Sequence, residues 1–413
     1  PEIQFSFREN VELVYRQLVD LLLQTSDTAT ENLIQDNIQQ ATQVIDSLQL
    51  AELENFLSCD LSERLESPQP TMDTTAATIY PIILEDRLEV ILKLSRSEKF
   101  SHYTIPLPKA QVEQVLDNWR RELEQLYVSA EGLSLSEQVY NWLIRPIQEQ
   151  LERDRVKTLV FVLDGPFRNV PMAALYDGQQ YLIEKGYATA VIPSLQLLEP
   201  EPPGKRPLNT LAFGLSEVRK NFPAHQGFPP LTNVETELKQ IQSQVSAQER
   251  LNQDFTSTTL QELVRSQPSS VLHLATHGQF SSNPEDTFIL AWDKRLTIAD
   301  LKTIFQSTSQ ESPQGIELLV LSACKTAEGD SRATLGLAGM AIESGARSTL
   351  ASLWNINDRS TAQLMSDFYK KLANSETITK AEALRQAQID LLKTSGYHSP
   401  RFWAPYILVG NWL

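Results

Sequence analysis

Two apolar runs that lead into reactive side chains decide the fold: SVLHLATHG at Ser270–Gly278 and LLVLSACKT at Leu318–Thr326. Each run has the continuous apolar or small residues of a strand buried on both faces, rather than an alternating pattern. His277 and Cys324 stand near the ends of these runs, where we expect the strands to open into loops. The carboxyl ends of neighbouring parallel strands meet at one edge of a sheet. We therefore expect His277 and Cys324 to lie side by side there.

Strands and helices alternate on both sides of these two runs. The pattern predicts strands at residues 210–214, 270–276, 288–291, 317–323, 348–353 and 406–409, and helices at 234–245, 257–266, 298–305, 335–344, 360–372 and 378–393. Alternation of apolar strands with amphipathic helices is typical of an α/β fold with a mostly parallel sheet. Ligands on such a sheet bind beyond the carboxyl ends of the strands.

The linker EPEPPGKRP at Glu199–Pro207 is the clearest domain boundary, because its prolines exclude a helix or a central strand. We expect a domain at 201–413 after it and an α/β half at 76–200 before it. That half has a hairpin around Glu85, helices at 109–128 and 136–153, and strands at 158–163 and 188–192. Residues 1–75 have helical periodicity at 10–23 and 41–56, and we expect this segment to pack on another part of the protein.

The composition narrows the classes of function. A net charge of −16 argues against nucleic acid or an anionic membrane surface as the main partner. No apolar run approaches the roughly 20 residues that span a bilayer. The two cysteines, Cys59 and Cys324, cannot form a disulfide framework and fit a reducing cytoplasm. The histidine and cysteine spacing predicts no metal site and no cofactor, although a need for calcium stays open.

A cysteine and a histidine at neighbouring strand ends have the residue types of a nucleophile and its acid/base partner. The imidazole would take the thiol proton and return it to the leaving amine. The backbone N–H groups of Gly278 and Cys324 are candidates for an oxyanion hole. The simpler alternative is a buried apolar cysteine and a hydrogen-bonded structural histidine. We favour that alternative for Cys59 and for His273, which lies within its strand.

Several motifs then resemble the CHAT proteases, relatives of caspases and separases that are often attached to tetratricopeptide repeats. The motifs are HLATHG at 273–278, LSACKTAEGD at 321–330, GLAGMAIESGARSTLASLWNINDRST at 336–361 and FWAPYILVGN at 402–411, with a weaker match at 160–177. The resemblance covers roughly residues 140–413. It implies a caspase-like fold with His277 and Cys324 as the catalytic dyad. The two residues are 47 positions apart, close to the roughly 50 that separate them in caspases.

The resemblance to separases implies three further features. Asp358 corresponds to the acidic residue that holds a basic side chain before the cut, since a carboxylate pairs bidentately with arginine. Its alternative role is to cap the helix that begins near Ser360. Residues 76–200 resemble the inactive, protease-like half of separases, and 1–75 resemble the segment that joins a repeat array to this module.

The sequence therefore predicts a cysteine endopeptidase that cuts after a basic residue, arginine or lysine, through an acyl-enzyme. A regulatory protein partner or self-processing would control it, with Arg332, Lys205 and Arg206 as possible self-cleavage points. Two alternatives stay open. One is a non-catalytic signalling scaffold that retains the fold, and the other is a different thiol acyl-transfer enzyme such as a transpeptidase.

Overall fold

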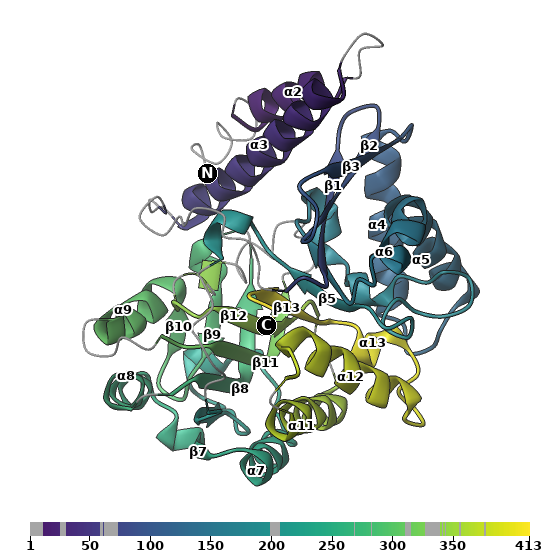
Figure 1. Ribbon diagram of the computed structural model, residues 1–413. Coiled ribbons are helices and arrows are strands. Elements are labelled where there is room, and N and C mark those ends of the chain that lie inside the picture. Colours follow the sequence, from purple (N-terminus) through teal and green to yellow (C-terminus); the bar gives the residue numbers. More distant parts are fainter. Residues whose placement is uncertain are drawn as a thin grey trace.

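The computed structural model describes residues 11–24, 30–57, 61, 73–198, 207–267, 269–281, 283–309, 315–326, 339–340, 342, 344–354, 357–375 and 377–413, with the backbone alone at 306–309 and 323–326. The described strands form a 13-stranded sheet flanked by helices (Figure 1). Most neighbouring strands are parallel. The predicted α/β fold with a mostly parallel sheet is confirmed.

The sheet runs through both parts of the chain, which we name the first half (residues 76–198) and the second half (residues 207–413). Its order is β10 (Arg295–Thr297), β9 (Phe288–Leu290), β8 (Val271–Phe280), β11 (Leu318–Thr326), β12 (Ser348–Ser352), β13 (Tyr406–Gly410), β5 (Ala188–Val191), β4 (Thr158–Phe161), β1 (Ala76–Ile83), β2 (Leu88–Leu94) and β3 (Phe100–Ile105). The strands β6 (Thr210–Gly214) and β7 (Ala247–Leu251) extend from β8. The halves meet where β13 pairs with β5, so they share one sheet across the predicted boundary near residue 200.

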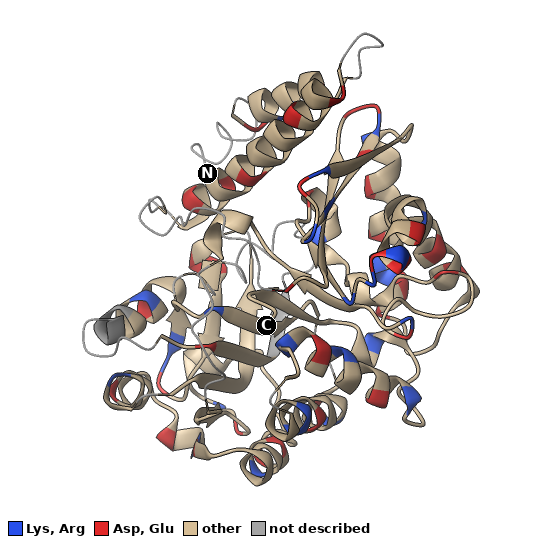
Figure 2. Ribbon diagram, viewed as in Figure 1, with Lys and Arg blue, Asp and Glu red and all other residues tan. Residues whose placement is uncertain are grey.

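Helices cover both faces of the second half. The helices α7 (Val234–Gln244), α11 (Asp358–Asn374) and α12 (Lys380–Lys393) contribute to one apolar cluster, whereas α8 (Ser257–Ser266) and α9 (Ile298–Ser309) contribute to another. The strand β8 contributes side chains to both clusters. Val271 and Ala275 belong to the first cluster, and Leu272 and Leu274 belong to the second. This explains why its sequence is apolar without alternation. Charged residues lie mainly on the surrounding helices and loops (Figure 2).

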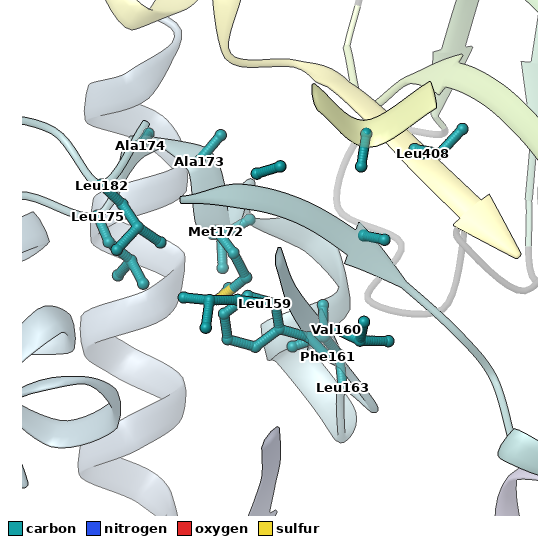
Figure 3. Close-up of a cluster of buried hydrophobic side chains, with 14 of the residues drawn as sticks. Leu159, Val160, Phe161, Leu163, Met172, Ala173, Ala174, Leu175, Leu182 and Leu408 are labelled. Carbon is teal, nitrogen blue, oxygen red and sulfur yellow. The ribbon is translucent and has the colours of Figure 1, made fainter. Parts of the chain in front are cut away.

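The first half has its own helical layer of α4 (Lys109–Leu123), α5 (Ala130–Leu143) and α6 (Gln148–Arg153). Figure 3 shows side chains of β4 packing against Met172, Leu175 and Leu182. The single helix predicted at 136–153 is wrong. Pro146 lies in a short 3-10 turn, Arg145–Ile147, between α5 and α6, because proline cannot donate the backbone hydrogen bond that would continue the helix.

The N-terminal helices α2 (Glu12–Leu23) and α3 (Glu31–Leu57) pack against the rest of the protein, as predicted (Figure 1). Ile38 and Ile45 join the core shared with the first half. Near the other end of α3, Leu53 and Phe56 pack against Ile298 of the second half. Among the described residues, no helix combines the length and apolar content needed to cross a bilayer.

Candidate active site

The strands that carry the two predicted dyad residues are neighbours. The strands β8 and β11 run parallel at the centre of the second half, with Ala323 opposite His277 and Cys324 opposite Gly278 (Figure 1). Residues paired across adjacent strands are roughly 5 Å apart at their Cα atoms. The expected proximity of the two segments is thus confirmed for the backbone.

Both residues lie further inside the sheet than expected. The strand β8 continues to Phe280 and β11 to Thr326, so the prediction that the strands open into loops at His277 and Cys324 is wrong. The reason is additional pairing, because β9 joins β8 at Gly278 and Gln279 while β11 stays paired on the other side. Gly278 therefore lies between two strands. The oxyanion-hole role of the Gly278 and Cys324 N–H groups stays a prediction.

The imidazole of His277 is fixed by the loop that precedes α7. Its Nε2 atom lies 2.7 Å from the carbonyl oxygen of Pro229. The ring of Phe228 packs on it, with centroids 4.9 Å apart and planes inclined by 32°. A carbonyl oxygen only accepts, so Nε2 carries the hydrogen. In the neutral ring Nδ1 is then the acceptor.

Burial lowers the pKa of His277, and hydrogen bonding to Pro229 and the charge of Asp358 only partly oppose this effect. The side chain is 8% exposed, and removal from water disfavours the charged imidazolium. His277 is consequently neutral near pH 7. A neutral, oriented imidazole whose second nitrogen is an acceptor has the properties of a general base.

Several predicted residues lie outside the described part of the structure. They are the side chain of Cys324, the whole of Cys59, and the possible self-cleavage points Arg332, Lys205 and Arg206. Most of the helix predicted at 335–344 lies outside it as well. The geometry of the site therefore rests on the backbone of β11 and on the surroundings of His277.

Asp358 is the first residue of α11, but it does not cap the helix. The side chain of Asn357 caps it, accepting from the N–H groups of Arg359 and Ser360 at 3.1 and 3.2 Å. The Oδ2 atom of Asp358 instead accepts from the backbone N–H of Asn233 at 2.6 Å and from its side-chain Nδ2 at 3.0 Å. The capping alternative is thus wrong. Asp358 is partly exposed and its charge acts on His277.

An arginine of the first half holds the segment that leads to Asp358. The Arg120 guanidinium lies over the Trp354 ring, 4.2 Å from its centroid, and its Nη2 donates to the Leu353 carbonyl at 3.0 Å. Arg120 belongs to α4. The first half thus contacts the second close to the candidate site. The sequence pattern did not identify Arg120, because contacts between distant segments leave no local signal.

A buried polar cluster lies behind the site. His273 contacts Glu237 and Tyr369, which confirms the prediction that this histidine is a hydrogen-bonded residue within its strand. Glu237 also accepts from the hydroxyl of Ser322, two residues before Cys324. The sequence analysis missed Glu237. Its only signal is a carboxylate beside the apolar stripe formed by Val234, Leu238 and Ile241 on α7.

The sequence profile of the CHAT domain matches residues 133–411. The chain belongs to the CHAT domain family. A chain from the crystal structure of the Saccharomyces cerevisiae separase–securin complex is similar in fold, with a TM-score of 0.54 at 10% identity. The match covers 98% of this CHAT domain protein and 37% of the yeast chain, so this protein spans well under half of that relative.

A second similar structure is that of the Arg-specific cysteine proteinase gingipain R, with a TM-score of 0.41 at 9% identity. That match covers 73% of this chain and 74% of the gingipain chain. Comparison with curated proteins gave no match. The family and the separase likeness establish a caspase-like fold.

Proposed function

We propose that this CHAT domain protein is a cysteine endopeptidase that uses His277 and Cys324 to cut protein substrates after arginine, and less readily after lysine. The observation that carries the proposal is the pairing of β8 with β11, which brings the His277 segment beside the Cys324 segment. Cysteine peptidases need a thiolate next to an oriented base. No cofactor enters the reaction.

The chemistry follows from the tautomer of His277. Its Nδ1 atom takes the proton of the Cys324 thiol, and the thiolate attacks the carbonyl carbon of the scissile peptide bond. The protonated imidazole then gives its proton to the leaving amine, which leaves a thioester acyl-enzyme. Water, deprotonated by the same imidazole, hydrolyses the thioester and releases the thiol. The Pro229 carbonyl holds the ring throughout, as the third group that orients the base.

Asp358 supplies the proposed preference for a basic side chain. Its carboxylate is partly exposed, and one oxygen is held by Asn233. A carboxylate fixed in this way suits a guanidinium better than an ammonium group, because arginine donates two parallel hydrogen bonds. A neutral side chain would leave the carboxylate unpaired and would be disfavoured.

Control by a partner protein or by self-processing completes the proposal. The yeast structure is a complex of separase with securin, and on that likeness we propose a regulatory protein partner here. Self-cleavage would fall at Arg332 or Lys205. The bond after Arg206 is a poorer site because Pro207 follows it.

A fluorogenic peptide panel that differs only at the residue before the cut tests the function. We expect the wild type to cut arginine peptides faster than lysine peptides and to spare neutral ones, whereas Cys324→Ala abolishes cutting. Asp358→Asn should reduce arginine cleavage about 100-fold, the order expected when a charged recognition partner is removed. Equal cutting by wild type and Cys324→Ala would refute the dyad.

The alternative function is a scaffold that binds partners through the same face without turnover. The absence of any cleavage, with and without the protein that binds the chain, would favour it. Partner binding by Cys324→Ala at unchanged affinity would point the same way. Mass spectrometry of the products separates hydrolysis from transpeptidation, because only the latter joins the acyl group to a second amine.

A further inference from the structure

In the buried polar cluster, Ser322 and His273 both contact one carboxylate oxygen of Glu237. The Oε1 atom of Glu237 accepts from the hydroxyl of Ser322 and from Nε2 of His273, the latter at 3.0 Å. Glu237 is 1% exposed, and Ser322 and His273 are fully buried. A buried carboxylate is retained at such cost only when donors satisfy it. Its two donors come from β8 and β11, the strands of the candidate dyad.

Two tyrosines add further hydrogen bonds to the cluster. The Tyr369 hydroxyl lies 3.1 Å from Nδ1 of His273, and burial together with the charge of Glu237 raises the Tyr369 pKa, which keeps it a donor. The Tyr406 hydroxyl donates to the Ser322 carbonyl at 3.2 Å. Ser322 is therefore held twice, through its hydroxyl and through its backbone.

Ser322 lies at the point of β11 where its pairing with β8 is irregular. Between Leu321 and Ala323 the register of β11 on β8 shifts, because β8 advances from Leu274 to His277 over the same interval. Ser322 is the residue at this irregularity. In this interval β8 has two residues, Ala275 and Thr276, where β11 has Ser322 alone. Such a bulge re-aims the residues that follow it on its own strand, and the first of these is His277, which pairs with Ala323, the residue before Cys324.

We propose that Glu237 and Ser322 are positioning residues that fix β11 at the irregularity and so hold Cys324 beside His277. The inference rests on the proposed function in taking Cys324 as the nucleophile. Neither residue touches the substrate. Their effect is on the geometry of thiol and imidazole, where a misplacement of about 1 Å is enough to cost roughly 100-fold in rate.

The test measures the reactivity of the thiol itself. Iodoacetamide alkylates a thiolate, forming a C–S bond as iodide leaves, and mass spectrometry gives the rate for Cys324 separately from that for Cys59. We expect Ser322→Ala to slow alkylation of Cys324 about tenfold and to raise the midpoint of its pH profile. The Cys59 rate and the melting temperature should stay close to wild type, and on peptides kcat should fall with KM unchanged.

Three variants make the comparison specific. Glu237→Gln keeps an acceptor oxygen and should stay near the wild-type rate, whereas Glu237→Met removes it and should slow alkylation. When Glu237→Met is combined with Ser322→Ala, the second change should slow alkylation of Cys324 little further, since both changes break the contact between Ser322 and Glu237. Ser136→Ala is the matched control, because it removes another buried hydroxyl, bonded to the Ala174 carbonyl at 2.6 Å in the first half.

A wild-type rate and pH midpoint in folded Ser322→Ala would overturn the inference. If that variant does not fold, Tyr406→Phe decides, since it removes the donor to the Ser322 carbonyl, together with a contact to the Thr361 hydroxyl at 2.9 Å that lies away from β11. Slower alkylation of Cys324 supports the inference and an unchanged rate overturns it. Failure of the proposed function looks different. Wild type then cuts no peptide, while Cys324 alkylation still responds to Ser322→Ala.

Discussion

The surroundings of His277 act on the pKa of its imidazole in opposite directions. Burial favours the neutral imidazole, while the Pro229 carbonyl and the Asp358 carboxylate favour its protonated form. Burial is the largest of these, so the pKa of His277 lies below its ordinary value. The resting base is neutral, and the nearby carboxylate can stabilise the imidazolium that forms once it accepts the thiol proton.

This balance predicts a pH dependence. A base with a lowered pKa loses its proton-accepting form only below its usual range, so the acid limb of kcat/KM should lie below pH 6.5. Asp358→Asn removes a charge that raises the pKa of His277 and should move the limb lower still. NMR titration of the ring in Cys324→Ala measures the histidine without the coupled thiol. A limb above pH 6.5 would contradict the assignment.

At the residue scale, the sequence predicted the pair His277–Cys324 because strand patterns and motif spacing are local signals. It did not predict Pro229, whose contribution is a backbone carbonyl brought in by a loop. Glu237 was missed for a similar reason. A carboxylate on an amphipathic helix usually faces water, and only the packing of α7 on the sheet turns this one inward.

At the element scale, the strands and helices with a clear apolar pattern were predicted more accurately than the polar strands. The bounds of β6 and α8 match the prediction, since Thr210–Gly214 and Ser257–Ser266 have clear patterns. The strands β3 and β7 were missed, because their residues are mostly half-buried and polar and lack a strong period. Their pairing depends on neighbours that are distant in sequence.

The helix α3 carries a carboxylate that is poorly matched to its surroundings. Asp46 is 5% exposed, and its Oδ1 atom has no hydrogen-bond partner among the described residues. Burial raises its pKa to about 7, with a hydrogen bond from the Leu195 backbone opposing the shift. Leu195 follows β5, so Asp46 joins α3 to the segment after that strand. Its burial there favours the protonated, uncharged form of the carboxyl group.

Asp46→Asn should therefore stabilise the protein at high pH. Between the ordinary pKa of 3.8 and about 7 the native state holds the extra proton, so wild-type stability falls as pH rises through this window. The variant does not lose stability in this window. We therefore expect its free energy of unfolding to exceed that of the wild type by about 2–4 kcal/mol at pH 8 and by little at pH 4. Urea unfolding at both pH values checks it. Asp36→Asn, on the exposed face of the same helix, should change stability at neither pH.

At the scale of the whole molecule, the α2–α3 pair is fastened to the first half by polar contacts. Arg16 of α2 donates to both carboxylate oxygens of Asp164, at 2.8 and 2.9 Å, and to the Ile83 carbonyl at 3.1 Å. Burial raises the pKa of Asp164, but the charges of Arg16 and Arg168 outweigh it and hold the pKa below its ordinary value. The ion pair thus lies at the carboxyl ends of β1 and β4, where the helices meet the sheet (Figure 1).

Breaking this ion pair should loosen the helices from the sheet. Arg16→Met leaves the carboxylate of Asp164, which is 2% exposed, without its main partner, and such a change costs about 3–5 kcal/mol. Asp164→Asn in the same chain should recover part of the loss. Thermal unfolding measures the stability, and hydrogen exchange of the α2 amides shows whether the helix detaches. The control is Lys99→Met, which breaks a pair to Glu31 whose side chains are 70% and 73% exposed, and which should lower the melting temperature far less than Arg16→Met does, because water screens an exposed pair. If the two variants lose equally little, Arg16 does not hold the helices in place.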